Sequence, residues 1–172
     1  MRASRRVLAM IACLTLCLTG IRAVAQSDEA VAERVLGPQW KQLSRRAGII
    51  FAGTLLTDQT QSTRVDRSTS SVELSFRVDR AIVGSQPGQI LKICEWTGAV
   101  SAHRPYRAGE HLLLFFYPPS RIGLTSPVGG SQGQIALDRN GRDLDQLERA
   151  IRAEREAEGA KPWRQHAREQ GR

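Results

Sequence analysis

The hydrophobic residues follow two different periods along the chain. Before residue 48 they recur at helical spacing, and Trp40, Leu43 and Ala47 fall on one face of a predicted helix. Between residues 72 and 79 apolar and polar residues alternate strictly, as in a strand with one buried and one exposed face. The apolar members of this alternation, expected in the core, are Val72, Leu74, Phe76 and Val78. The pattern predicts helices first and an antiparallel sheet after them.

Short apolar runs separated by turn residues extend the predicted sheet. The predicted strands span residues 49–57, 72–83, 89–96, 111–117, 122–125 and 134–137. The polar stretch 58–70 is interpreted as the connection of the first hairpin, and the apolar run 111–117 as a central strand. Strands and helices do not alternate, which excludes a Rossmann-type sheet. The series favours a small antiparallel barrel, closed or nearly closed, in a mainly β fold.

Helix signals flank the predicted barrel on both sides. Ser27 can cap a first helix that ends at Gly37, and Pro38 can begin a second helix that ends at Gly48. Asp143 can cap a C-terminal amphipathic helix. The apolar stripe of that last helix consists of Leu144, Leu147 and Ile151. The predicted organisation is a signal peptide at 1–25, an N-terminal helical segment at 26–47, the barrel domain at 48–141, the C-terminal helix at 142–158 and a disordered basic tail at 159–172.

The first 25 residues have the features of a secretory signal. Three arginines precede the apolar run 7–18, and Ala23 and Ala25 form a small-x-small cleavage site. Cleavage after Ala25 makes Gln26 the mature N-terminus. No later segment approaches the roughly 20 apolar residues of a membrane span, so no stable membrane anchor is expected. The predicted location is periplasmic or extracellular.

Cleavage changes both the charge and the cysteine content. The formal charge of +8 includes four arginines of residues 1–25, so the mature chain carries 8 − 4 = +4. A mildly basic exported chain does not predict nucleic-acid binding. Cys94 is the one cysteine that remains, so no intramolecular disulfide can form. Its apolar surroundings predict a buried structural thiol.

Segments of the strand series resemble a known group of proteins. These segments are residues 47–55, 76–84 and 106–115, followed by the glycine-rich stretch 124–134. They resemble the OB-like barrel of the netrin-module and tissue-inhibitor-of-metalloproteinases (TIMP) group, and more closely small exported bacterial proteins of unknown function with that pattern. The resemblance implies an OB-like fold, which does not by itself imply function. Inhibition of zinc proteases does not carry over, because those inhibitors use an N-terminal cysteine and disulfides.

One motif raises the alternative of a small exported serine hydrolase. Gly129 to Gly133 matches the Gly-x-Ser-x-Gly pattern around Ser131, and Asp138 or Asp143 and then His166 follow in triad order. A nucleophile elbow needs a helix after the serine, whereas a strand is predicted there. We therefore assign no catalytic residue and predict that the chain is not an enzyme.

No metal site or cofactor is predicted. Cys94, His103 and His111 have no compact zinc-ligand spacing. The stretch 138–141 has its glycine misplaced for a calcium loop.

Three residues flank or lie in the predicted loop 97–110. Trp96, Arg104 and Tyr106 are of types favoured at protein interfaces, and loops of OB-like barrels often carry binding. In the alternative interpretation, Trp96 and Tyr106 pack the loop onto the barrel. We predict an exported, non-enzymatic module that binds a protein partner through this loop and the stretch 58–70. The oligomeric state is left open.

A third interpretation uses the basic tail. Lys161, Arg164 and Arg168 could bind a polyanion or a carbohydrate. Binding of that kind would be sensitive to salt and would be lost on truncation after Gly159.

Overall fold

The structure is a computed structural model that describes residues 27–66, 69–100, 103–138 and 143–159. The predicted signal peptide and the tail beyond Gly159, with His166, lie outside the described residues. The strands are β1 (Ile49–Asp66), β2 (Thr69–Val83), β3 (Ile90–Trp96), β4 (His111–Phe116), β5 (Leu124–Thr125) and β6 (Gln134–Ala136). The helices are a first helix over residues 27–36, α2 (Trp40–Arg46), α3 (Thr97–Val100), the 3-10 helix η1 (Gly130–Gly133) and α4 (Leu144–Gly159).

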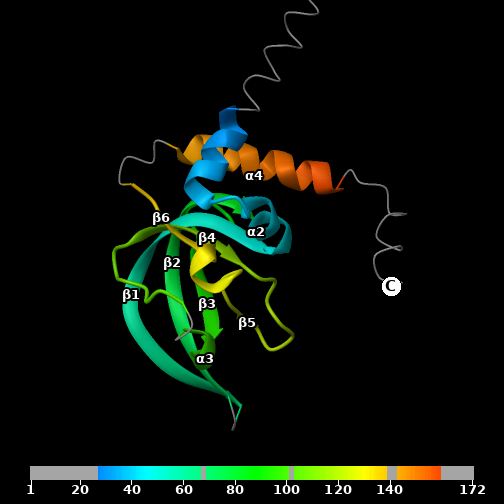
Figure 1. The fold of residues 1–172 in the computed structure, drawn as a ribbon. Coiled ribbons are helices and arrows are strands. Elements are labelled where there is room, and N and C mark those ends of the chain that lie inside the picture. Colours follow the sequence, from blue (N-terminus) through cyan, green and yellow to red (C-terminus); the bar gives the residue numbers. More distant parts are fainter. Residues whose placement is uncertain (1–26, 67–68, 101–102, 139–142, 160–172) are drawn as a thin grey trace, which may run out of the picture.

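Within these residues, six strands form one mixed sheet in the order β5-β3-β2-β1-β4-β6 (Figure 1). The pairs are antiparallel, apart from β3 with β5, which is parallel. The predicted sheet is confirmed, but its ladders leave β5 and β6 as edges, so the sheet is not closed. An isolated antiparallel bridge joins Phe116 of β4 to Pro127, just after β5. Helices contribute about as much of the described chain as strands, so the fold is not mainly β.

The first hairpin is longer than the sequence predicts. β1 and β2 pair from Ile50↔Val83 out to Asp66↔Thr69, so most of the stretch predicted as a connection, 58–70, is strand. The threonines of this stretch favour the extended backbone, and hairpin pairing lets polar residues continue a ladder. Along β1, only residues 49–54 pair with β4. Along β2, only residues 71–77 pair with β3. Residues 57–66 and 69–70 of the hairpin are called the arm. Residues 57–63 still pair with the part of β2 that β3 borders, and residues 64–66 and 69–70 extend beyond the rest of the sheet (Figure 1).

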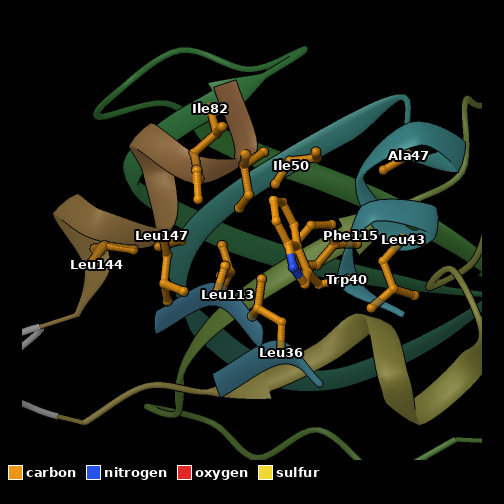
Figure 2. Close-up of a cluster of buried hydrophobic side chains, with 14 of the residues drawn as sticks. Leu36, Trp40, Leu43, Ala47, Ile50, Ile82, Leu113, Phe115, Leu144 and Leu147 are labelled. Atoms are coloured by element: carbon orange, nitrogen blue, oxygen red, sulfur yellow. The ribbon is translucent and has the colours of Figure 1, made fainter. Parts of the chain in front are cut away.

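The first helix, α2 and α4 cover one face of the sheet, where a first hydrophobic cluster lies. Trp40 of α2 sits in the middle of it, between Leu36, Ile50, Leu113 and Phe115 (Figure 2). Leu144, Leu147 and Ile151 of α4 are buried there, as their helical spacing predicts. The pattern of a C-terminal amphipathic helix is therefore confirmed.

A second cluster fills the other face, around which the sheet curls. Phe76 of β2 lies 6.4 Å from Phe116 of β4, measured between ring centroids, although β1 separates these strands. Phe51 of β1 packs edge-on against Phe76 at 5.6 Å. β2 contributes four alternating residues to this second cluster, Val72, Leu74, Phe76 and Val78. Because β4 contributes to both clusters, it is apolar along almost its whole length.

Two arginine side chains of α4 hold the helices together by hydrogen bonds. Arg149 of α4 donates to both carboxylate oxygens of the buried Asp28, at 2.8 and 3.0 Å. Arg155 donates to the carbonyls of Ser44 and Arg45, both at 3.1 Å, and so satisfies groups at the C-terminal end of α2. These contacts join the first and last helices of the described chain into one layer.

None of the helices in the described part of the chain is long and apolar enough to cross a membrane.

Candidate functional site

A buried polar network lies at the end of β3. The Glu95 side chain is 0% exposed. Its Oε2 lies 2.7 Å from Nε2 of His103, and its Oε1 accepts a 2.7 Å hydrogen bond from the Tyr106 hydroxyl. On the far side of the imidazole, Nδ1 lies 3.0 Å from Nε2 of Gln134 and 3.1 Å from the Arg104 carbonyl oxygen. These four side chains, Glu95, His103, Tyr106 and Gln134, are called the buried network below.

The buried network joins three parts of the chain that are distant in sequence. Glu95 belongs to β3 and Gln134 to β6. His103 and Tyr106 belong to the segment 103–110, called the loop below, whereas residues 97–100 of the predicted loop form α3. The Tyr106 ring packs edge-on against Phe76 at 5.7 Å and against His103 at 5.2 Å. The network therefore fixes the loop on the second hydrophobic cluster.

Burial controls the protonation of this network. Loss of hydration raises the pKa of Glu95, and the hydrogen bonds with Tyr106 and His103 oppose that rise. Burial also raises the pKa of Tyr106, and the nearby Glu95 carboxyl adds to the effect. Tyr106 therefore stays a phenol and donates its hydrogen bond at every physiological pH. Glu95, His103 and Tyr106 turn their hydrogen-bonding atoms to one another inside the fold, and this arrangement holds the loop in place. Oε1 of Gln134 is buried without a hydrogen-bond partner among the described residues.

The structure separates the three residues predicted for binding. The Tyr106 side chain points inward, to Glu95 and Phe76. This agrees with the alternative interpretation, in which Tyr106 packs the loop onto the sheet. Trp96 is 54% exposed at the end of β3 and pairs with Ser71 at the base of the arm. The Arg104 side chain is 42% exposed and lies beside Glu110, with Nη1 2.7 Å from Oε1. Trp96 and the arm thus share one end of the sheet.

Glu95 and Gln134 were not predicted as site residues. One signal for Glu95 exists in the sequence, because it follows Leu91 and Ile93 at the core-facing positions of β3. A carboxyl group in that register requires buried hydrogen-bond partners. Gln134 has no comparable signal, since it meets His103 only through folding across 31 residues.

The Trp96 indole rests on Gly98, and this contact can be tested. A Cβ atom added at Gly98 would lie 2.6 Å from Cη2 of Trp96, so we expect Gly98→Ala to displace the ring toward water. Stability should change by less than about 1 kcal/mol, because the ring is largely exposed. Acrylamide quenching of tryptophan fluorescence should increase. Both variants are measured in a Trp163→Phe background, where Gly159→Ala, with nothing within 4 Å, is the control and should leave quenching unchanged.

The surroundings of Ser131 differ from a nucleophile elbow. Ser131 lies in η1, which β6 follows at once, whereas an elbow leads into a helix. Its Oγ accepts a 3.0 Å hydrogen bond from the Arg104 amide. Of the predicted triad partners, Asp143 lies 3.2 Å from Nη2 of Arg34, and His166 is outside the described residues. The geometry gives Ser131 a part in holding the loop to η1.

The remaining candidate ligands lie apart from one another. Cys94 is half-buried, and burial raises the pKa of its thiol. His103 belongs to the buried network, and Nε2 of His111 lies 3.5 Å from Asp79. In the part of the chain that the structure describes, no group of three or more His, Cys, Asp or Glu side chains is arranged to hold a metal ion.

Comparison with known proteins gives no match, either to a protein-family profile or to a curated protein. Function is therefore inferred from the residues and geometry of this chain.

Proposed function

We propose that the chain is an exported, non-enzymatic binding module that recognises another protein through the surface around Trp96. The observation that carries this proposal is the 54% exposed indole at the end of β3, next to a loop that the buried network holds in place. Cleavage after Ala25 would release the module into the periplasm or the extracellular space.

The exposed indole suits recognition of a protein surface. Tryptophan and arginine are enriched among the residues that dominate binding energy at protein interfaces. A loop fixed before binding loses little conformational entropy when the partner arrives. The arm adds extended backbone edges on both sides of the hairpin. Beside Trp96, β3 ends and leaves residues 69–70 of β2 unpaired with it, and on the far side β4 does not pair with β1 beyond Thr54. The proposed surface comprises Trp96, α3 and the arm.

The sheet geometry supports, as part of the same proposal, an OB-like barrel of the netrin and TIMP type. OB folds are small, partly open barrels. The curled sheet, the second hydrophobic cluster inside it and the bridge from Phe116 to Pro127 across its opening are consistent with that architecture.

A capture experiment tests the binding surface. The tagged chain Gln26–Arg172 is crosslinked to periplasmic and secreted proteins, and the captured partner is then titrated with purified variants. We expect Trp96→Ala to weaken binding about thirtyfold, which corresponds to about 2 kcal/mol. The matched control is Ile90→Ala, because Ile90 is 61% exposed on the same strand, about 20 Å from Trp96.

Two results would count against the proposal. Equal weakening by Trp96→Ala and Ile90→Ala would mean that the partner does not recognise the end of β3. A partner that binds both variants as tightly as the wild type would place the binding surface elsewhere.

A further inference from the structure

The imidazole of His103 lies between two partners that require opposite protonation states of Nδ1. The Arg104 carbonyl oxygen, at 3.1 Å, can only accept a hydrogen bond, whereas Nε2 of Gln134, at 3.0 Å, can only donate one. Nδ1 therefore satisfies the carbonyl when it carries a proton and the amide when it does not. The imidazole is 1% exposed, so bulk water does not replace the partner that is lost.

On the opposite side of the ring, Nε2 of His103 and Oε2 of Glu95 share one proton across 2.7 Å. The other carboxyl oxygen, Oε1, accepts a hydrogen bond from the Tyr106 hydroxyl, so a proton on the carboxyl group must lie on Oε2. The contact between Oε2 and Nε2 holds this proton whether it belongs to the carboxyl group or to the imidazole. The number of protons in the buried network therefore changes at Nδ1.

The side-chain amide of Gln134 can follow this change. Its Oε1 is buried and has no hydrogen-bond partner among the described residues, while its Nε2 faces His103. A half-turn about the last side-chain bond exchanges the two atoms, so that Oε1 accepts from a protonated Nδ1. Each protonation state of His103 thus has its own orientation of the Gln134 amide.

The surroundings favour the state with the additional proton. With Nδ1 protonated, Glu95 and His103 together carry no net charge, whereas loss of that proton leaves one buried negative charge. Burial raises the pKa of Glu95 for the same reason. The loop cation, Arg104, lies beside Glu110, and α3 and η1 contain no ionisable side chain. The residues that face the pair from the neighbouring elements are uncharged, namely Tyr106 of the loop, Gln134 of β6, Thr125 of β5 and Val72 of β2.

We propose that Glu95 and His103 form a pH-dependent switch that holds the loop on β3 while Nδ1 is protonated and releases it when pH rises and that proton is lost. In the protonated state every atom of the pair has a partner, and the loop stays closed. In the deprotonated state the carboxylate gains hydration if the loop lifts from β3, so the buried charge favours opening.

Opening of the loop breaks two backbone contacts that anchor it. The Arg104 amide donates to Oγ of Ser131 at 3.0 Å, and the Gly109 amide donates to the Leu55 carbonyl at 2.8 Å. Trp96 directly follows Glu95 in β3, so an open loop also loosens the surface around the indole. Only this last consequence rests on the proposed function.

Nuclear magnetic resonance spectroscopy of the chain Gln26–Arg172, without any partner, tests the switch. We expect the nitrogen resonance of His103 Nδ1 to change from the protonated to the unprotonated type between about pH 5 and about pH 9. The side-chain amide signals of Gln134 should move with the same midpoint. Protection of the Arg104 and Gly109 amides against hydrogen exchange should fall about tenfold for each unit by which the closed loop raises the pKa of the pair.

Glu95→Gln is the matched variant. Its Oε1 can accept from Tyr106, and its amide nitrogen donates to Nε2 of His103 at every pH, so the proton stays on Nδ1. We expect the loop of this variant to remain closed, with protection that does not change with pH. His111→Gln alters a histidine outside the buried network and should behave as the wild type.

Either of two observations would overturn the switch. One is a wild-type Nδ1 resonance that keeps the same type over this whole pH range. The other is a Glu95→Gln variant whose loop loses protection as steeply as the wild type when pH rises. Neither observation bears on the proposed binding surface, which is tested with a captured partner at a single pH.

Discussion

Replacing Glu95 with alanine is expected to lower the free energy of unfolding by about 3–5 kcal/mol. The change removes the shared partner of His103 and Tyr106, both held at 2.7 Å, and leaves a void in a fully buried position. Loss of one partner of a buried, hydrogen-bonded group carries a cost of this size, because the other polar groups stay buried and unpaired. Urea denaturation followed by circular dichroism at pH 5, close to the ordinary pKa of a glutamate, measures it.

Glu95→Gln is the matched control for this prediction. Glutamine keeps the volume, its Oε1 can accept from Tyr106, and its amide nitrogen can donate to a neutral His103. We expect a loss of less than about 1.5 kcal/mol, the range of one ordinary hydrogen bond. If alanine and glutamine at position 95 cost the same, the hydrogen bonds of the buried network do not hold the loop.

Comparison of the wild type with Glu95→Gln shows the pH dependence that Glu95 causes. Its pKa is raised in the folded state, so folded Glu95 keeps its proton at pH values where the unfolded chain has lost it. The contribution of Glu95 to stability is therefore fully present below its ordinary pKa of about 4.3 and falls as pH rises through the raised value. The difference in unfolding free energy between the wild type and Glu95→Gln should decline from pH 4 to pH 8. A difference that grows with pH would contradict the raised pKa.

Gly133→Ala is expected to destabilise the fold by about 2–3 kcal/mol. An added Cβ atom would lie 2.6 Å from the Val128 carbonyl oxygen and 2.9 Å from the Phe115 carbonyl oxygen. Both atoms are backbone, so they cannot move aside as a side chain would, and η1 must shift away from β4 and from the segment after β5. Thermal unfolding followed by circular dichroism measures the loss.

Ser131→Ala is the control in the same motif. Ser131 is exposed and its Oγ accepts one hydrogen bond from Arg104, so we expect a loss below about 1 kcal/mol. A large effect at Gly133 with a small one at Ser131 means that the glycines of this motif serve close packing. Loss of a hydrolytic activity in Ser131→Ala, with stability unchanged, would instead support the hydrolase alternative.

The sheet and the flanking helices could be predicted because their signals are local. Strict alternation placed Val72, Leu74, Phe76 and Val78 in the core, and helical spacing identified the buried stripe of α4. The arm could not be predicted, because its polar residues lack the apolar alternation that marks a half-buried strand. Backbone hydrogen bonds between β1 and β2 hold the ladder of the arm together. The polarity of its side chains gives little indication of this pairing.

The site was predicted only in part, because its contacts are distant in sequence. Trp96 is exposed as a binding residue should be, but the residues that position its loop come from three elements. A tyrosine is compatible with a position that faces a partner and with one that faces the core. Residue type alone therefore cannot distinguish these two roles for Tyr106. The inward position of Tyr106 depends on Glu95, which faces the core and accepts the hydrogen bond of the Tyr106 hydroxyl.

Site-specific photo-crosslinking tests the proposed binding surface most directly. A benzophenone amino acid is placed at position 96 or, as the control, at position 90 of the full chain expressed in cells, and the cells are irradiated. We predict one discrete protein adduct from position 96 that is weak or missing from position 90. The same adduct in equal yield from both positions, or an adduct from position 90 alone, would contradict a binding surface centred on Trp96.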